Sequence, residues 1–440
     1  MKRGMRVAFG LVLLLCILIG GGYAFMSQAS FGKLPEGARL DAISQSPHYE
    51  DGAFRNTEPL PLIKGNGGIV GALMKYVFSS TEGQKPARPM PSAKTDLRAL
   101  DRNTDTVVWL GHSSYFVQLG GRRILIDPVF STFASPVFFA NRAFEGTNLY
   151  TAEDMPDIDY LLISHDHWDH LDYATATALR SKVGQVVCPL GVGAHFEAWG
   201  YGKETVFEGD WYSALEGEEG FAIHILPARH FSGRSLTRNK TLWAGFALVT
   251  PERRIFFSGD SGYGKHFAEI GARFGGFDLA MLDCGQYDEN WRYVHMMPED
   301  TAQAAEDLRA RALLPGHMGK FAIAYHTWDD PFKRIVAASR IGFSCPCSVS
   351  PSLCPSLRTV SSPAGGKPDG NTASLMSEKA PFPCLSRGMP GPFFFVEGRA
   401  RFSSETFSFP STMSSHDLRA HSHGRAYFFA CSLIRSISSK

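Results

Sequence analysis

The sequence predicts an α/β domain in which helices cover packed β-sheets, and two patterns support this prediction. Short β-rich segments follow one another from residue 106 onward, and Gly111 and the Gly120–Gly121 pair separate them as turns would. Helical patterns interleave with these segments as far as residue 311. Strands mixed with helices in this way are typical of sheets that bury one face beneath helices.

The strands are expected at nine places: 106–110, 115–119, 123–126, 157–164, 185–188, 222–226, 243–249, 254–258 and 279–282. Helices are expected at 173–181, 192–199 and 298–311. The last begins with Pro298, Glu299 and Asp300, and proline and acidic residues favour a helix start.

The first 29 residues form a separate segment. Lys2, Arg3 and Arg6 precede an uncharged, largely aliphatic stretch, which indicates a secretory signal peptide or an uncleaved membrane anchor. About 20 apolar residues span a bilayer, so length does not distinguish the two. A buried core helix is the remaining alternative. The positive charges favour a cytoplasmic N-terminus, so we expect a cell-envelope protein whose following domain lies outside the cytoplasm.

Three further regions follow this segment. Residues 30–104 are rich in Gly, Pro and polar residues, and we expect an extension that wraps the core and contributes one helix over the apolar patch at 69–78. Residues 105–340 carry the regular α/β signals. Residues 341–440 are dense in Ser, Pro and Cys and show no sustained period.

The composition of residues 341–440 fits neither a disordered tail nor a folded domain. Disordered segments are poor in aromatic residues, whereas this segment contains Phe393–Phe395 and Tyr427–Phe429. Our hypothesis is that it results from a shifted reading frame near Ala338, and a disordered or separately folded tail is the alternative. The other two frames of the gene distinguish these possibilities.

Charge and cysteine placement exclude two classes. The formal net charge is +1, which provides no basic surface for nucleic acid, so we expect no nucleic-acid partner. Between residues 30 and 340 the only cysteines are Cys188 and Cys284, so this part of the chain has no disulfide framework.

The strongest chemical signal is the segment HDHWDH at residues 165–170, directly after an apolar strand. Three imidazoles and two carboxylates within six residues suit a metal such as zinc, which takes nitrogen and oxygen ligands. In a tight loop, His165 and His167 can face one ion, while Asp169 and His170 reach a second.

More candidate ligands follow later strands. His230, Asp260 and His317 each stand just after an apolar run, as a site built on the end of a sheet requires. Asp260 follows Gly259, which allows a close approach of the backbone. Taken alone, His230 or His317 is better explained as a structural histidine.

The order HxHxDH, His, Asp, His resembles the metallo-β-lactamase superfamily. A closer resemblance is to the branch containing N-acyl-phosphatidylethanolamine phospholipase D and its bacterial relatives. It covers residues 62–334 and excludes the tail. The segments that carry it are WLGHSS (109–114), IDPVFS (126–131), ARHFSGR (228–234), LWAGF (242–246) and HMGKF (317–321).

The resemblance implies a metallo-β-lactamase αββα sandwich with two zinc ions. It assigns His165, His167 and His230 to the first ion, Asp169, His170 and His317 to the second, and Asp260 to both. It also implies hydrolysis of an N-acyl phosphatidylethanolamine-like lipid, in which a metal-bridging hydroxide attacks the phosphodiester phosphorus. Asp169, Asp260 and His295 are the expected catalytic residues.

Substrate contacts are expected from His295, His326 and Gln286. The branch places a substrate-contacting histidine at His295, although a structural histidine at a helix start explains it equally well. Asp127, at a strand-to-loop turn, is expected to support the ligands without binding metal itself. With a full ligand set, Cys284 is not expected to bind metal.

Residues 129–144 carry Phe130, Phe133, Phe138, Phe139 and Phe144. They form either an apolar lid for acyl chains or packing within the core or between the subunits of a homodimer. The lid interpretation, combined with the N-terminal segment, places a lipid-facing site at a membrane.

Two alternatives to the phosphodiesterase remain open. One keeps both metals but cleaves a lactone or an amide, because this fold supports many chemistries. The other is a non-catalytic envelope protein with a structural metal site.

Overall fold

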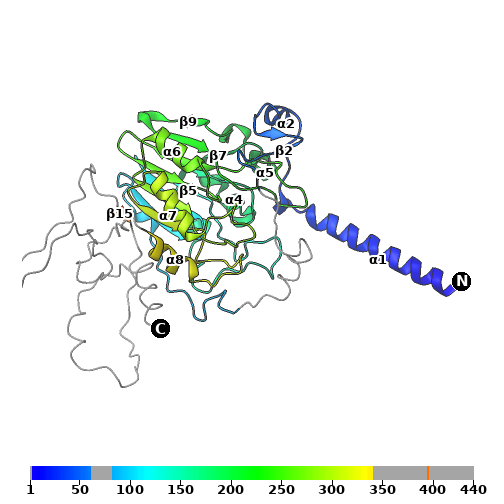
Figure 1. The fold of residues 1–440 in the computed structure, drawn as a ribbon. Helices are drawn as coiled ribbons and strands as arrows, with labels where there is room; N and C mark the ends of the chain where they lie inside the picture. Colours follow the sequence, from blue (N-terminus) through cyan, green and yellow to red (C-terminus); the bar gives the residue numbers. More distant parts are fainter. Residues whose placement is uncertain (1, 61–81, 340–393, 396–440) are drawn as a thin grey trace, which may run out of the picture.

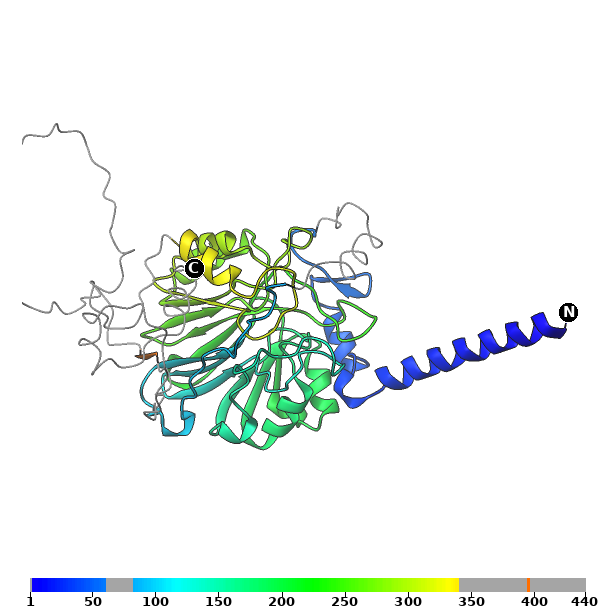
Figure 2. The same cartoon turned by 90° about the horizontal axis from the view of Figure 1, so that it is seen from below.

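The computed structural model describes residues 2–60, 82–339 and 394–395. Two β-sheets pack face to face, and helices cover the outer face of each (Figure 1 and Figure 2). This arrangement confirms the αββα sandwich that the sequence predicts.

The seven-stranded sheet has the strand order β15-β3-β4-β5-β6-β7-β8. Strands β3, β4 and β5 are antiparallel neighbours, and β5 to β8 are parallel. Its strands are β3 (Thr106–Gly111), β4 (Ser114–Leu119), β5 (Arg122–Ile126), β6 (Ile158–Leu162), β7 (Val183–Pro189), β8 (Val206–Gly209) and β15 (Phe394–Phe395), which pairs with β3.

The six-stranded sheet has the order β14-β13-β12-β11-β10-β9. Strands β9 to β12 are antiparallel neighbours, whereas β12, β13 and β14 run parallel. Its strands are β9 (Ala214–Glu216), β10 (Ala222–Leu226), β11 (Gly245–Val249), β12 (Arg254–Phe257), β13 (Leu279–Asp283) and β14 (Leu313–Gly316).

Side chains alternate between two hydrophobic layers along each strand, as the twofold period of a strand requires. On β4, Tyr115, Val117 and Leu119 point into the core between the sheets. Phe116, between them, points outward into the layer beneath α4 (Tyr173–Leu179) and α5 (Gly193–Ala198). A third layer lies beneath the helices α6 (His266–Phe274), α7 (Pro298–Asp307) and α8 (Asp330–Ala338).

Residues before β3 attach to this sandwich. Helix α1 (Lys2–Met26) is exposed along its length and is long and apolar enough to cross a membrane, a test that a cleaved signal sequence also passes. It is followed by α2 (Ala38–Ile43), the short strands β1 (Tyr49–Glu50) and β2 (Ala53–Phe54), and several 3-10 turns. Arg39 in α2 pairs with Glu197 and Glu208, each at 2.6 Å, and fastens the extension to the domain.

The 3-10 turns are η1 (Ala29–Phe31), η2 (Leu97–Ala99), η3 (Ala152–Asp154), η4 (Arg180–Lys182), η5 (Lys203–Thr205) and η6 (Glu218–Gly220). The cysteines of the domain, Cys188 and Cys284, are buried free thiols. Burial raises the pKa of both thiols above the ordinary value.

All nine predicted strands and three predicted helices form, with ends that differ by a few residues. Helices α6 and α8 and strands β8, β9 and β14 were not predicted. The helix expected at 69–78 lies outside the described residues, as does the tail apart from 394–395, so these two expectations stay predictions.

Replacing Phe246 by Ala is expected to lower the free energy of unfolding by about 3–5 kcal/mol, because the ring is fully buried between the sheets and its removal leaves a cavity. Denaturant titration measures this. Phe138, which is 78% exposed, provides the matched control, and Phe138→Ala should change stability by less than about 0.5 kcal/mol. Equal effects of the two substitutions would contradict the described core.

Candidate metal centre

The HDHWDH loop, residues 165–170, begins three residues after Leu162, the last residue of β6. Its start is fixed by Asp127, which accepts a hydrogen bond from Ser164 N at 2.8 Å and another from Ser164 Oγ at 2.5 Å. The backbone then turns tightly, since His170 N and Leu171 N both donate to His167 O. The loop therefore presents its histidines and Asp169 from one compact turn.

A first cluster forms around His167. Its Nδ1 lies 2.8 Å from His165 Nε2 and 3.2 Å from His230 Nε2. Nitrogen ligands of one tetrahedral zinc ion stand about 3.3 Å apart, given Zn–N bonds of about 2.0–2.1 Å. These three nitrogens are therefore spaced much as a bound cation requires.

A second cluster contains Asp169, His170 and His317. Asp169 Oδ2 lies 3.3 Å from His317 Nε2 and 3.6 Å from His170 Nε2. The ligand atoms of these three residues and of His112 all lie within 4.8 Å of one another.

Asp260 connects the two clusters. Its Oδ2 lies 3.7 Å from both His165 Nε2 and His230 Nε2, and 3.0 and 3.3 Å from the Nε2 atoms of His170 and His317. The structure thus brings together all seven residues that the sequence assigned to metal binding, with Asp260 in the bridging position.

Strand direction explains this convergence. The parallel strands β12, β13 and β14 end together, and Asp260 follows β12, Asp283 ends β13 and His317 follows β14. In the other sheet, β5 and β6 are parallel neighbours and lead into Asp127 and the HDHWDH loop. Because the carboxyl ends of parallel strands share one edge, both sheets deliver their polar side chains to the same end of the sandwich.

Gly259 permits the approach of Asp260. Its φ is +57°, and a Cβ atom there would lie 2.6 Å from Ala244 O. Only glycine fits such a position without strain, so the close backbone approach expected at Gly259 is confirmed.

Electrostatics prepare the first cluster to bind a cation. Burial lowers the pKa of His165 and His230 well below the ordinary value, and neighbouring histidines lower it further. Burial also lowers the pKa of His167 to about 4. All three imidazoles are therefore neutral at pH 7, the state in which a ring nitrogen binds metal.

The second cluster is more acidic in character. Burial opposes ionisation of Asp260 and Asp169, but His170 and other histidines outweigh it and hold the pKa of both carboxyls well below the ordinary value. Burial likewise lowers the pKa of His317, but Asp260 and Asp283 raise it to about 10. Two buried carboxylates are thus charged at neutral pH, and a metal cation is a natural partner for them.

The residues fit a metal on independent structural grounds. The Oδ1 atom of Asp260 is buried and has no hydrogen-bond partner among the described residues. A buried charged oxygen without a partner is costly. A cation between the clusters would satisfy this oxygen and separate the converging nitrogens of His165, His167 and His230.

Three of the candidate ligands are also held at the ring nitrogen that faces away from the clusters. Asp127 Oδ2 lies 2.8 Å from His170 Nδ1, and Ser164 Oγ lies 3.0 Å from His165 Nδ1. His230 Nδ1 donates to Val294 O at 2.9 Å. Such contacts fix ring orientation and direct the other nitrogen at the metal. The structure places Asp127 in the supporting role expected for it.

The sequence placed the segment 283–287 at the rim of the site but predicted no contact of His112 or Asp283 with the candidate ligands. His112, fully buried after β3, lies 3.0 Å from Asp169 Oδ2 through its Nε2. Asp283 contacts His317 Nδ1 through Oδ1 at 3.2 Å and His295 Nδ1 through Oδ2 at 2.9 Å. The signal for both was present, because each polar residue directly follows or ends a strand.

His295 stacks on His317, with ring centroids 4.9 Å apart and an angle of 16° between the rings. Since Asp283 holds its Nδ1, the Nε2 atom remains available to a substrate. His295 and Asp169 keep exposed side-chain fractions of 13% and 14%, whereas the side chains of His165, His170, His230, His317 and Asp260 are at most 2% exposed. Solvent therefore reaches the clusters past these two side chains.

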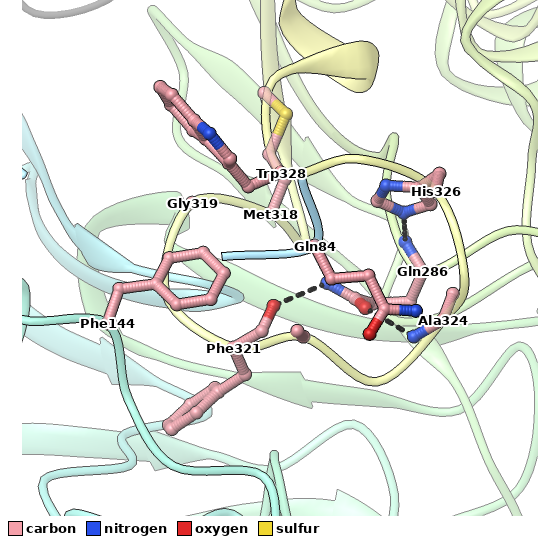
Figure 3. Close-up of a pocket in the computed structure, with 10 residues that line it drawn as sticks. Gln84, Phe144, Gln286, Met318, Gly319, Phe321, Ala324, His326 and Trp328 are labelled. Atoms are coloured by element: carbon pink, nitrogen blue, oxygen red, sulfur yellow. Dashed lines mark hydrogen bonds between the residues drawn. The ribbon is translucent and has the colours of Figure 1, made fainter. Parts of the chain in front are cut away.

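Gln286 and His326 lie in a separate pocket beside the clusters (Figure 3). The Gln286 amide donates to Phe321 O and His317 O and accepts from Ile323 N and Ala324 N. His326 accepts from Gln286 N at 2.9 Å. These bonds hold the loop after His317 in shape, and substrate contact by either residue stays a prediction.

Seven candidate nitrogen and oxygen ligands at the end of an αββα sandwich fit a metal-dependent hydrolase. The comparisons with known proteins agree. Residues 122–318 match the family model described as "Beta-lactamase superfamily domain". The chain is 37% identical over 309 residues to an uncharacterized protein of Mycobacterium tuberculosis, covering 69% of this chain and 83% of that protein. The chain belongs to the metallo-β-lactamase superfamily.

Two further relatives refine the position within the superfamily. An "N-acyl-phosphatidylethanolamine-hydrolyzing phospholipase D 1" of Caenorhabditis elegans is 33% identical over 225 residues, which is 48% of this chain and 63% of that protein. The "Outer membrane protein RomA" of Klebsiella pneumoniae is 65% identical over 98 residues, which is 22% of this chain and 74% of that protein. The first relative supports the predicted branch.

Replacing Asp127 by Ala is expected to weaken metal binding about 10–100-fold, because His170 loses the carboxylate that orients its ring. Competition with a chromogenic chelator measures the affinity. Asp278→Ala, at the opposite end of β13, is the control and should leave metal affinity unchanged. An unaltered affinity in Asp127→Ala would show that His170 is not a ligand.

Proposed function

We propose that this protein is a zinc-dependent phosphodiesterase of phospholipase D type that cleaves an N-acyl phosphatidylethanolamine-like lipid. The observation that carries the proposal is the position of Asp260, within 3.7 Å of four histidine nitrogens drawn from both clusters. A binuclear site suits displacement at a phosphodiester, and the name of the C. elegans relative states this substrate class.

Two ions would be held by His165, His167 and His230 on one side and by Asp169, His170 and His317 on the other, with Asp260 between them. The donor set of imidazoles and carboxylates favours zinc. Ions in this position supply a hydroxide at neutral pH and positive charge for the phosphoryl oxygens.

The chain itself contributes orientation and proton transfer. Asp283 Oδ2 lies 2.9 Å from His295 Nδ1, so His295 presents its Nε2 at the open side of the clusters. From there it is placed to hydrogen-bond the phosphate or move a proton to the leaving oxygen. Asp169, whose side chain is 14% exposed, lies on the same open side.

The cellular setting follows from α1 and from the RomA relative, whose name places that protein in an outer membrane. We propose that the protein resides in the cell envelope, with the catalytic domain outside the cytoplasm, and contacts the membrane through its N-terminal segment. Homodimer formation stays a prediction.

The direct test is turnover of N-acyl phosphatidylethanolamine by the purified full chain, with release of phosphatidic acid and the N-acylethanolamine as the readout. Chelation should abolish turnover and zinc should restore it, while Asp169→Asn should be inactive at normal fold stability. A lactone and a β-lactam are tested in parallel as alternative substrates. Lactone hydrolysis without diester hydrolysis would refute the proposal, and bound metal without any hydrolysis would indicate a structural site.

His295→Ala is expected to lower kcat about 10²–10⁴-fold with little change in zinc content, because general acid–base groups contribute in this range and His295 is outside the proposed ligand set. His224→Ala, on the half-buried face of β10, is the matched control and should retain turnover. Loss of zinc in His295→Ala would instead identify His295 as a ligand.

A further inference from the structure

The residues between α1 and the domain form a fixed contact with it. This connector, residues 27–33, is held by four hydrogen bonds between its backbone and three side chains of the domain. Trp199 Nε1 donates to Ala29 O at 2.7 Å, Arg234 Nη2 donates to Ser30 O at 2.8 Å, and Lys33 N donates to His195 Nδ1 at 3.0 Å. Because backbone atoms are bound on both sides of Phe31, the connector is docked along its length.

The side chains that hold the connector also hold the HDHWDH loop. Arg234 Nη1 donates to Asp166 O at 2.9 Å and to Leu171 O at 2.6 Å, and its guanidinium lies 4.0 Å from the ring centroid of Trp168. His195 Nε2 lies 3.4 Å from Asp166 Oδ2. The connector and the loop that carries four candidate ligands are therefore bound to the same two side chains.

Aromatic packing extends this contact to α1. Phe25, in the last turn of α1, packs edge-on against Phe31 at 5.3 Å between centroids, and Phe31 packs edge-on against Trp168 at 5.0 Å. Trp168 stands between His167 and Asp169 in the chain. A continuous row of three rings thus connects the C-terminal end of α1 to the HDHWDH loop. This contact fixes the position of that end of the helix on the domain.

The direction of α1 follows from the sheet. β15 pairs with Thr106 and Val107 at the start of β3, while His112 follows the other end, so β15 and the metal centre lie at opposite ends of that strand. In both Figure 1 and Figure 2, α1 leaves the body on the side opposite β15. Helix α1 therefore projects outward from the same end of the sandwich that carries the metal centre.

Exposed apolar side chains lie at this same end. Beyond α1, the three most exposed large apolar residues in the described part of the chain are Leu236 at 86%, Phe138 at 78% and Phe139 at 76%. Phe138 and Phe139 belong to the segment after β5, and Leu236 lies two residues from Arg234, between β10 and β11. The first segment follows the end of β5, next to Asp127, and the second follows the end of β10 and contains His230.

This result separates the two interpretations of residues 129–144. Phe144 is buried and Phe130 packs against the core, as the packing interpretation expects. Phe138 and Phe139 instead face solvent and contact each other at 5.4 Å. Exposed neighbouring aromatic rings are unfavourable in water and mark an interaction site.

We propose that the docked connector holds α1 so that the bilayer it spans lies against the metal-centre end, where Phe138, Phe139 and Leu236 insert into the lipid leaflet. The bilayer is the occupant because a membrane-spanning helix leaves from this surface and is fixed to it. The role in lipid hydrolysis rests on the proposed function: a lipid headgroup reaches the clusters without leaving the membrane. Insertion itself does not depend on that function.

The first experiment measures insertion directly. The full chain is reconstituted in phosphatidylcholine–phosphatidylglycerol vesicles carrying brominated acyl chains, which quench the fluorescence of tryptophans in the lipid. The quenching of each variant is compared with that of the wild type, whose seven tryptophans give the background emission. Phe139→Trp should add a quenched emission. Glu219→Trp, at an 83% exposed side chain at the opposite end of the sandwich, is the control and should add an unquenched one.

The second experiment tests the docking. A Cβ at Gly32, whose φ is +71°, would lie 2.0 Å from His195 Nδ1, so Gly32→Ala should displace the connector. Gly37→Ala is the matched control, since Gly37 also has a positive φ but nothing within 4 Å of a Cβ. Gly32→Ala should remove the added quenching in the Phe139→Trp background and slow vesicle lipid hydrolysis about tenfold. Hydrolysis of a water-soluble diester should change less than about twofold.

The outcomes separate the two proposals. An unquenched Phe139→Trp in a protein that still hydrolyses vesicle lipid overturns the membrane surface and leaves the proposed function intact. Quenching without lipid hydrolysis supports the membrane surface and overturns the proposed function. Equal quenching in the Gly32→Ala and Gly37→Ala backgrounds overturns the role of the connector.

Discussion

The structure depends on one electrostatic constraint: imidazole nitrogens and carboxylates, most of them buried, converge at one end of the sandwich. The Nε2 atoms of His165 and His230 both lie within 3.2 Å of His167 Nδ1, and Asp260 has one buried oxygen without a partner among the described residues. Such a cluster is unfavourable unless a cation occupies it. The sandwich, the hydrogen bonds to the outer ring nitrogens of His165, His170, His230 and His317, and the glycine before Asp260 all hold this arrangement in place.

The sequence was sufficient for the sheets and for the seven candidate ligands because both leave local marks. A strand is recognised by its run of apolar or alternating residues. A candidate ligand is recognised by its place directly after a strand, as with Asp260 after β12. Helices α6 and α8, of nine residues each, were missed although the shorter helices α4 and α5 were predicted, so length does not account for the omission. Strands β8 and β9 were missed because their residues are only partly buried and so show no alternation.

His112 and Asp283 illustrate a different limit. Both lie against candidate ligands, but only the fold brings them there: His112 is 57 residues from Asp169, and Asp283 is 34 from His317. A polar residue at a strand end is common, and the sequence alone does not show which strand ends meet. Burial then decides the outcome, because a buried Asp283 has no water to accept from and must pair with the two histidines beside it.

The two thiols of the domain bear on where it is able to fold. Cys188 and Cys284 are buried in different hydrophobic layers, and their raised pKa keeps them as unreactive thiols. Neither the reducing cytosol nor an oxidising periplasm would alter them in the native state. The domain can therefore mature on either side of a membrane without an oxidoreductase, and heterologous production does not require an oxidising host.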